Sequence, residues 1–326
     1  MEESPSLERI LEMARGYWQA RVLITAVEHD FFTFVARGAG RAPEVAMAAR
    51  TDARATELVL NALVGLGLLE KRDGRYSNTP EAEQFLVADS ETYIGGGFGH
   101  YNYIWDSWSQ LDDVVRTGEP ATPSERFPDA TERFMAAMAS FSHDRTERVA
   151  DLIELDNVKR ALDLGGGPGQ YACAFARRNA SLEAVVFDRP AVAPIAERGI
   201  AAAGLSDRVS TLTGDFLVDD IGEGYDLILG SAIIHSCSPA ENELLYAKCH
   251  AALNDGGRFV IQDFILDESK TSPASGALFA INMLVNTEGG ASWSEPEVRG
   301  WLAGAGFSAV ERVDTEVGTT LMIGTR

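Results

Sequence analysis

Hydrophobic and polar residues follow two different patterns along the chain. Up to about residue 150, apolar residues recur with helical spacing, beginning with an amphipathic stretch from Ser6 to about Phe34. From Lys159 onward, short apolar runs alternate with helical segments, which is typical of a parallel sheet covered by helices. The pattern therefore predicts a helical N-terminal half and an α/β C-terminal half.

Two short helices and a hairpin are predicted between residues 42 and 76. Thr51-Asp52 separates the helices and is a suitable N-cap, and Asp73-Gly74 is a typical hairpin turn. Helix, turn, helix and hairpin together outline a winged helix. This shape serves either DNA binding or protein packing and dimerisation. The second helix, residues 54–68, is mostly apolar and offers few donors to bases or phosphates, which favours packing.

The second half contains seven expected strands. The last two lie close together near Gly318 and predict an antiparallel hairpin at the sheet edge. The expected strands are residues 160–164, 183–187, 209–213, 225–230, 258–264, 307–313 and 319–323.

Composition narrows the possible partners. The chain has 326 residues, 45% hydrophobic and 24% charged, as in a globular protein of two domains. Its net charge of −21 disfavours nucleic acid and anionic membranes as partners. Three scattered cysteines, with no apolar signal segment or membrane span, predict a cytoplasmic protein. No acidic or histidine cluster has convincing metal-ligand spacing.

A glycine cluster follows the first strand of the second half directly. The run Ala161-Leu162-Asp163-Leu164-Gly165-Gly166-Gly167-Pro168-Gly169 leads into a helix near Tyr171, so it is a ligand-binding turn at a strand's carboxyl end. A dinucleotide fingerprint requires a third glycine, but Gln170 stands there. Asp163 precedes Gly165 and Gly167. We therefore predict S-adenosyl-methionine (SAM), which has no phosphate and carries an ammonium group that an acid can hold.

Two further strand ends carry groups suited to adenosine. Asp188 ends the next strand and is placed to accept hydrogen bonds from both ribose hydroxyls. After the third strand, Asp215 can accept from the adenine amino group and Phe216 can stack on the ring. The alternative interpretation of Asp215 is a loop or cap residue. Taken together, the three strand ends predict an adenosine site.

These motifs resemble one known family over nearly the full length. The chain is similar to the SAM-dependent O-methyltransferases that include plant caffeic-acid-type, acetylserotonin-type and many bacterial secondary-metabolism enzymes. The resemblance implies a class I methyltransferase Rossmann-like sheet behind an N-terminal helical winged-helix dimerisation domain, and hence a homodimer. The implied domains are residues 1–92 for dimerisation, 93–150 as a helical linker that lines the substrate, and 151–326 for SAM binding and catalysis. The residues that carry the resemblance are 162–169, 188–190, 214–216, 256–258 and 304–307.

His235 is the candidate general base. It follows Ser231 just past the carboxyl end of a strand, and the family's catalytic base stands at this position. A phenol is mostly protonated at neutral pH, so a histidine that takes its proton assists methyl transfer. By the same resemblance, Ser231 belongs to the cofactor site and Asp263 is the acid that orients the histidine.

The surroundings of His235 depart from the family pattern. Ser236-Cys237 replaces the usual aspartate and tryptophan, and the second orienting acid of plant members falls near Ser292. Glu288 or Glu295 is an alternative source of that charge. A single orienting acid predicts a less activated histidine, sufficient for an acidic hydroxyl or an enolisable carbon.

The acceptor site is expected on two helices and an aromatic segment. The aromatic-rich residues 93–118 either line an apolar pocket or form core between domains. The resemblance places six side chains toward a small-molecule acceptor. They are Phe134, Met138, Phe141, Asn282, Met283 and Asn286.

Three functional hypotheses follow. The first is an O-methyltransferase for an aromatic or polyketide-like hydroxyl. The second keeps SAM but methylates carbon or nitrogen, or uses the cofactor without methyl transfer. The third is a winged-helix regulator that senses a metabolite, which requires salt-dependent DNA binding.

Overall fold

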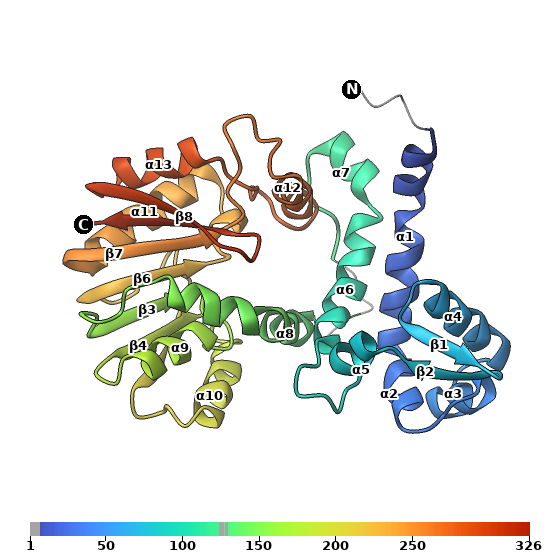
Figure 1. Cartoon of the computed structure of the whole chain (residues 1–326). Helices are drawn as coiled ribbons and strands as arrows, with labels where there is room; N and C mark the ends of the chain where they lie inside the picture. Colours follow the sequence, from blue (N-terminus) through green and yellow to red (C-terminus); the bar gives the residue numbers. More distant parts are fainter. Residues whose placement is uncertain (1–6, 124–126, 128–129) are drawn as a thin grey trace, which may run out of the picture. The chain divides into compact units, whose positions relative to one another are not determined.

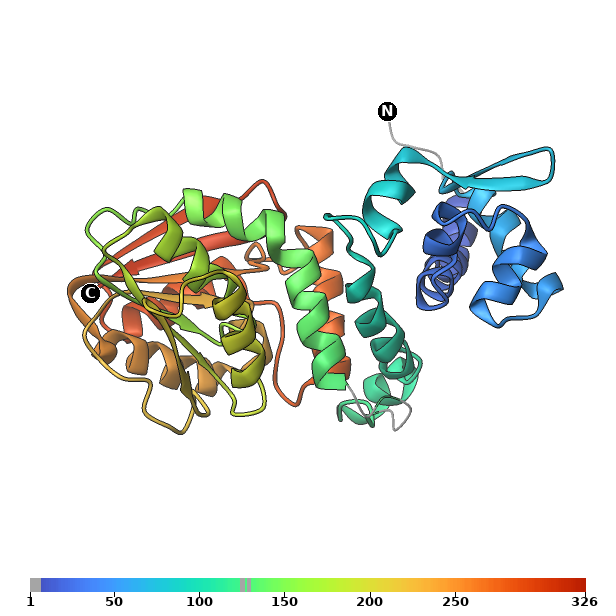
Figure 2. The same ribbon diagram turned by 90° about the horizontal axis from the view of Figure 1, so that it is seen from below.

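The computed structural model describes residues 7–123, 127 and 130–326, without the side chains of residues 142–144. The chain forms two compact units. Unit 1 comprises residues 1–104 and 129–140, and unit 2 comprises residues 105–128 and 141–326. The boundaries after residues 104 and 140 fall inside helices, α6 (Phe98–Trp108) and α8 (Ala130–Asp151). Figure 2 shows α8 as one continuous green helix. The sequence-based division at residues 92 and 150 remains a prediction.

Unit 1 begins with two helices where the sequence shows one apolar stretch. Helix α1 ends at Glu28 and α2 begins at Phe31, because Asp30 takes a left-handed conformation with φ 54°. The Asp52 side chain caps the fourth helix by accepting from the Ala55 amide at 2.8 Å, as predicted. These helices are α1 (Leu7–Glu28), α2 (Phe31–Ala36), α3 (Ala42–Ala49) and α4 (Ala53–Gly65).

The predicted hairpin follows α4 (Figure 1). Strands β1 (Leu69–Arg72) and β2 (Arg75–Asn78) pair antiparallel around Asp73 and Gly74, whose positive φ values match a two-residue hairpin turn. The order of helix, turn, helix and hairpin is therefore confirmed. Unit 1 continues through α5 (Pro80–Leu86) and η1 (Gly95–Gly97) into α6.

Helix α1 exposes a set of large apolar side chains. They are Leu7, Ile10, Met13, Tyr17 and Trp18, each more than half exposed. A contiguous apolar face of this kind marks an interaction surface. We call these five residues the α1 stripe.

Unit 2 is built on a seven-stranded sheet in the order β5-β4-β3-β6-β7-β9-β8. Its first five strands are parallel, while β9 pairs antiparallel with both β7 and β8, which confirms the expected edge hairpin. The strands are β3 (Arg160–Leu164), β4 (Glu183–Asp188), β5 (Val209–Thr213), β6 (Tyr225–Ser231), β7 (Leu253–Asp263), β8 (Ala309–Asp314) and β9 (Thr320–Thr325).

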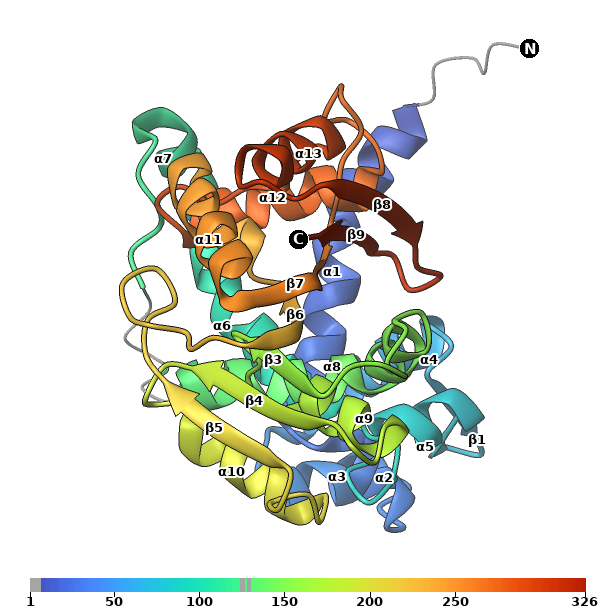
Figure 3. The same cartoon turned by 90° about the vertical axis from the view of Figure 1, so that its left-hand side faces the viewer.

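Helices cover both faces of this sheet, as Figure 3 shows with α11 and α9 on opposite sides. One core joins the end of α8 with α9 and α10, and the other joins α11 with α13. The remaining elements of unit 2 are α7 (Leu111–Thr117), α9 (Gln170–Arg178), α10 (Ala193–Ala202), η2 (Ile234–Ser236), α11 (Pro239–Ala252), α12 (Ala274–Asn286) and α13 (Glu295–Gly304).

Within the described residues, no helix is both long and apolar enough to cross a membrane. In the same part of the chain, no group of histidine, cysteine and acidic residues is arranged to hold a metal ion.

Candidate active site

The glycine turn after β3 packs closely against the chain around it. Gly165 has φ 65°, and a Cβ there would come within 2.6 Å of Ile233. The Gly165 amide donates to the Phe187 carbonyl at 2.8 Å, which ties the turn to β4. Glycine is therefore required here by backbone conformation and by close approach.

Asp163 lies beneath this turn. Its side chain is buried, Oδ2 accepts from the Ala172 amide at 3.1 Å, and Oδ1 has no partner among the described residues. Burial raises the pKa of Asp163 to about 7; the Ala172 hydrogen bond acts against this and the charge of Asp188 adds to it. The structure thus contains a buried carboxyl group with spare hydrogen-bonding capacity beside the turn.

Asp188 holds the other side of the turn. Its Oδ2 accepts from the Gly167 amide at 2.8 Å and its Oδ1 from the Arg189 amide at 2.7 Å. Asp188 is only partly buried, so its remaining lone pairs can reach a ligand.

Asp215 and Phe216 follow β5. Asp215 is exposed and its Oδ1 accepts from the Leu217 amide at 2.9 Å, so it does cap its own loop. Phe216 is half-buried against the α11 side of the core. The three strand ends β3, β4 and β5 are adjacent in the sheet, and they bring these groups to one edge.

A polar network centred on Gln262 adjoins the glycine turn. Gln262 Oε1 accepts from the hydroxyls of Tyr171 at 2.7 Å and Ser231 at 2.5 Å, while Nε2 donates to Thr319 Oγ1 at 2.9 Å. Gln262 is buried and hydrogen-bonded through both its oxygen and its nitrogen. Its own position is therefore fixed, and it fixes the position of Ser231 in turn. The sequence reasoning identified Ser231 and missed Gln262 and Tyr171.

Arg145 and Thr146, near the end of α8, add unpaired groups beside Tyr171. Arg145 Nε and Thr146 Oγ1 are buried and have no hydrogen-bond partner within the described residues. Burial raises the pKa of Tyr171, while a hydrogen bond with Ser231 and the positive charge of Arg145 act in the opposite direction. An unpaired guanidinium nitrogen and a hydroxyl are suitable donors to a carboxylate.

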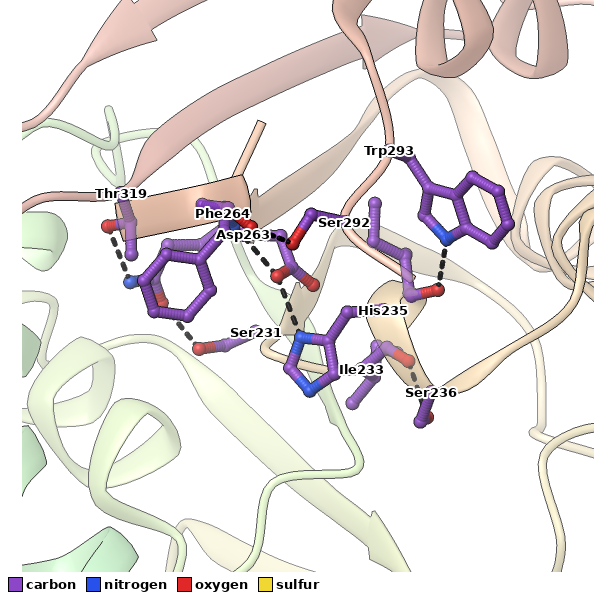
Figure 4. A network of polar contacts seen from close by, with 12 residues as sticks. Ser231, Ile233, His235, Ser236, Asp263, Phe264, Ser292, Trp293 and Thr319 are labelled. Carbon is purple, nitrogen blue, oxygen red and sulfur yellow. Dashed lines mark hydrogen bonds and ion pairs between the residues drawn. The ribbon is translucent and has the colours of Figure 1, made fainter. Parts of the chain in front are cut away.

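His235 and Asp263 form a hydrogen-bonded pair (Figure 4). His235 lies in η2, directly after β6, and its Nδ1 is 2.7 Å from Oδ1 of Asp263 at the end of β7. The side chains are 12% and 1% exposed. Ala232 turns the chain between β6 and η2. Its φ of 56° is uncommon for a residue other than glycine.

This pairing sets the roles of the two imidazole nitrogens. A carboxylate only accepts hydrogen bonds, so Nδ1–H of His235 donates to Asp263, and in the neutral imidazole Nε2 keeps its lone pair. Asp263 Oδ1 also accepts from the Phe264 amide at 2.8 Å, which holds the carboxylate in place. The arrangement is suited to proton abstraction by Nε2.

No second acid forms a hydrogen bond or ion pair with His235 in the described part of the chain. Ser292 donates to the Gly276 carbonyl at 2.8 Å, and Glu295 is engaged by Arg299 at 2.7 Å and Arg312 at 2.5 Å. Glu288 is exposed. His235 therefore has one orienting acid in the described part of the chain.

The loop before α13 supports η2 instead. The Trp293 indole donates to the Ile234 carbonyl at 2.9 Å, and a Cβ on Gly290 would lie 2.3 Å from the His235 carbonyl oxygen. These backbone contacts fix the segment that carries His235. Figure 4 shows Trp293 and Asp263 approaching this segment from different elements.

The six expected acceptor residues are distributed over two helices. Phe134 and Met138 lie on the part of α8 in unit 1, and Phe141 lies on the part in unit 2. On α12, Asn282 accepts from the Trp108 indole, Met283 is buried, and the Asn286 amide donates to the Asn282 carbonyl at 2.8 Å. Their contact with an acceptor remains a prediction.

Comparison with known proteins places the chain in a family. Residues 108–308 match the O-methyltransferase domain, and residues 11–88 match the O-methyltransferase dimerisation domain. The chain belongs to the O-methyltransferase family. The resemblance to this family, predicted from the sequence motifs, is confirmed. The fold is that of a class I methyltransferase with an N-terminal helical dimerisation domain.

Individual relatives of this O-methyltransferase cover nearly its whole length. It is 34% identical to 3-hydroxy-5-methyl-1-naphthoate 3-O-methyltransferase of Streptomyces sahachiroi, over 93% of this chain and 90% of that one. It is 30% identical to N,N-dimethyltransferase OxyT of Streptomyces rimosus, over 96% and 95% of the two chains. Human N-acetylserotonin methyltransferase in complex with SAM shares 25% identity, with a TM-score of 0.88 over 100% of this chain and 99% of that one.

The cofactor of this O-methyltransferase is SAM. The residues present fit it: an unpaired buried carboxyl oxygen on Asp163 suits an ammonium group. When bound, SAM supplies an electrophilic methyl group, so the protein must orient an acceptor and manage its proton.

Proposed function

We propose that this enzyme transfers the methyl group of SAM to a hydroxyl of an aromatic or polyketide-like small molecule, with His235 as the general base. The observation that carries the proposal is the hydrogen bond between His235 Nδ1 and Asp263 Oδ1. It leaves Nε2 as the acceptor of the hydroxyl proton, and Asp263 stabilises the imidazolium that forms. Orientation and general-base assistance are then the protein's contributions.

The cofactor-binding residues are proposed from their places at the strand ends. Asp188 takes the ribose hydroxyls, Asp215 and Phe216 take the adenine, and Asp163 faces the ammonium group. Gly165, Gly167 and Ser231 are proposed to lie next to the bound cofactor.

Two groups that the sequence reasoning missed complete the cofactor proposal. Arg145 Nε and Thr146 Oγ1 are assigned to the SAM carboxylate, because they are buried donors beside Tyr171 and Ser231.

From the family resemblance, six side chains on α8 and α12 are proposed to contact the acceptor. Phe134, Met138 and Phe141 share one face of α8 and offer apolar contact, while Asn282 and Asn286 on α12 offer polar contact beside Met283. Similarity to a hydroxynaphthoate O-methyltransferase supports a fused aromatic acceptor.

Methylation at nitrogen or carbon is the second candidate. One observation favours it: His235 has a single orienting acid in the described part of the chain, and the positions expected for another carry Ser292 and the engaged Glu295. An amine or an acidic carbon needs less help from a base than a phenol. The relative named N,N-dimethyltransferase OxyT is consistent with this candidate.

We further propose a cytoplasmic homodimer with no nucleic-acid partner. The α1 stripe overlaps the matched dimerisation domain. A dimer interface would bury its exposed apolar side chains away from water. The negative charge opposes binding to phosphate backbones, and the three cysteines are unpaired.

Isotope transfer tests the proposed reaction. Enzyme is incubated with methyl-labelled SAM and a panel of hydroxyarenes, arylamines and enolisable diketones, and the products are fragmented by mass spectrometry. We expect label on oxygen, lost as a labelled methyl from a methoxyarene. Label on nitrogen or carbon alone would establish the second candidate, and unlabelled products would exclude methyl transfer.

A further inference from the structure

The Trp108 indole fixes the orientation of the Asn282 side chain. Trp108 Nε1 donates to Asn282 Oδ1 at 2.9 Å, and both residues belong to unit 2. An indole N–H is only a donor, so the amide oxygen of Asn282 must face it. The Asn286 amide donates to the same oxygen at 3.2 Å, which reinforces this orientation.

The amide nitrogen of Asn282 is therefore directed away from Trp108. Within the described residues, its two N–H groups have no hydrogen-bond partner, whereas its oxygen accepts two hydrogen bonds. The side chain is half-buried. Asn282 thus presents a preoriented donor on the surface of α12.

The Asn282 donor lies about one helical turn from Phe279, the residue of α12 that contacts His235. Phe279 packs edge-on against His235, with ring centroids 4.8 Å apart, and against Phe264 at 4.2 Å. Asn282 is three residues further along α12, on the same face and about 4.5 Å along the helix axis. Phe279 therefore contacts His235, and Asn282 follows Phe279 on the same face of α12.

We propose that Asn282 donates a hydrogen bond to a second oxygen of the acceptor, a ring carbonyl or acyl oxygen placed about one ring position beyond the methylated hydroxyl. This inference rests on the proposed function and adds a chemical class to it, since simple phenols lack the second oxygen. Phe279 supplies the apolar contact between the two polar points. Trp108 acts as a positioning residue, because it holds the amide in its donating orientation.

A purely structural hydrogen bond between Trp108 and Asn282 would behave differently. It would need only the Asn282 oxygen, and Asn282→Asp keeps such an oxygen and the size of the side chain. The same substitution replaces the N–H donors by an acceptor. The variant therefore separates a donor function from a packing function.

The test measures binding of two matched ligands to the enzyme saturated with S-adenosyl-homocysteine. 4-Acetyl-2-naphthol has the second oxygen, and 4-isopropenyl-2-naphthol replaces it by a carbon of similar shape. Calorimetry gives both dissociation constants for the wild type, Asn282→Asp and Trp108→Phe. We expect the wild type to prefer the acetyl ligand about tenfold, in line with one good hydrogen bond. Asn282→Asp should abolish or invert the preference, and Trp108→Phe should reduce it.

Equal binding of the two ligands by the wild type, or the same preference in wild type and Asn282→Asp, would overturn the inference. Labelled SAM distinguishes this from failure of the proposed function. Discrimination with no methylation of either ligand would refute the proposed reaction and retain the Asn282 donor. Methylation of both ligands with equal efficiency and equal affinity would refute the Asn282 donor and retain the proposed reaction.

Discussion

His235 Nδ1 lies 2.7 Å from Asp263 Oδ1, and this contact joins the segment after β6 to the end of β7. Both elements belong to the same sheet and are paired in parallel register up to Ser231 and Gln262. The imidazole is thus oriented by the sheet itself. The proposed chemistry depends on this relationship, and the first two predictions test it.

Removal of the imidazole should impair turnover and spare cofactor binding. We expect His235→Ala to lower kcat for a phenolic acceptor by about 10²–10⁴-fold, the usual contribution of general-base assistance. SAM affinity, measured by calorimetry, should change little because His235 is not among the proposed cofactor residues. His29→Ala, an exposed histidine of unit 1, is the matched control. Undiminished turnover in His235→Ala would remove this residue from the mechanism.

Neutralisation of Asp263 should depend on the acidity of the acceptor. Asp263→Asn keeps the shape but loses the charge that stabilises the imidazolium. We expect kcat to fall by about 10²-fold for a phenol of pKa near 10, and by much less for an acceptor already ionised at neutral pH. Initial rates on a series of substituted naphthols measure this. A uniform loss across the series would point to a structural role for Asp263.

Asp163 should make the free enzyme less stable as pH rises. Its pKa is raised to about 7 by burial, so between about pH 4 and 7 the folded protein keeps a proton that the unfolded chain has lost. Unfolding then releases a proton, and the free energy of unfolding falls across this window before levelling off above pH 7. Urea denaturation of SAM-free enzyme from pH 5 to 8 should show a shallower decline for Asp163→Asn than for the wild type.

Asp226 provides a control of opposite sign. Burial acts to raise its pKa, but hydrogen bonds from Asn254 and from the amides of Lys159 and Arg160 outweigh this and lower it. Its stabilising contribution is present above the unfolded pKa and disappears as pH falls through the folded one. Asp226→Asn should therefore cost stability at neutral pH and less in acid. The same pH response in both variants would contradict the assignment for Asp163.

Asp188 should determine cofactor affinity. We expect Asp188→Asn to raise the dissociation constant of SAM about tenfold or more, because hydrogen bonds to a charged acceptor are the stronger kind. The asparagine oxygen can still accept from the Gly167 amide, so the turn is preserved. Asp207→Asn, at an exposed position after α10, should leave the constant unchanged.

The α1 stripe should control the oligomeric state. We expect the double substitution Met13→Glu with Tyr17→Glu to shift the protein from dimer to monomer in sedimentation velocity, since charge would replace exposed apolar surface. Leu244→Glu, at an exposed apolar position on α11, should sediment as the wild type does. A dimer that persists in the double variant would place the interface elsewhere.

The sequence predicted the elements well where local rules decide them. The seven strands, the Asp52 cap and the Asp73-Gly74 turn were found because apolar runs and turn residues act over a few positions. The break at Asp30 was missed, since a left-handed residue other than glycine has no strong sequence signal. His235 and Asp263 were paired correctly through family resemblance.

Contacts between distant segments were beyond the sequence. Gln262 stands next to Asp263, but nothing local indicates that it joins Tyr171, Ser231 and Thr319. The hydrogen bond from Trp108 to Asn282 spans 174 positions and has no periodic signature. Such contacts depend on tertiary packing, which single-sequence patterns do not encode.

Gln262 and Asp263 are consecutive on β7 and point to opposite faces of the sheet, one toward Tyr171 and the other toward His235. A single peptide bond therefore separates the group that organises the proposed cofactor side from the group that orients the base. A slip of one residue in the pairing of β7 would exchange the two faces and disable both. Phe279 and Asn282 lie instead on α12, outside the strand pairing that both halves of the proposed reaction share.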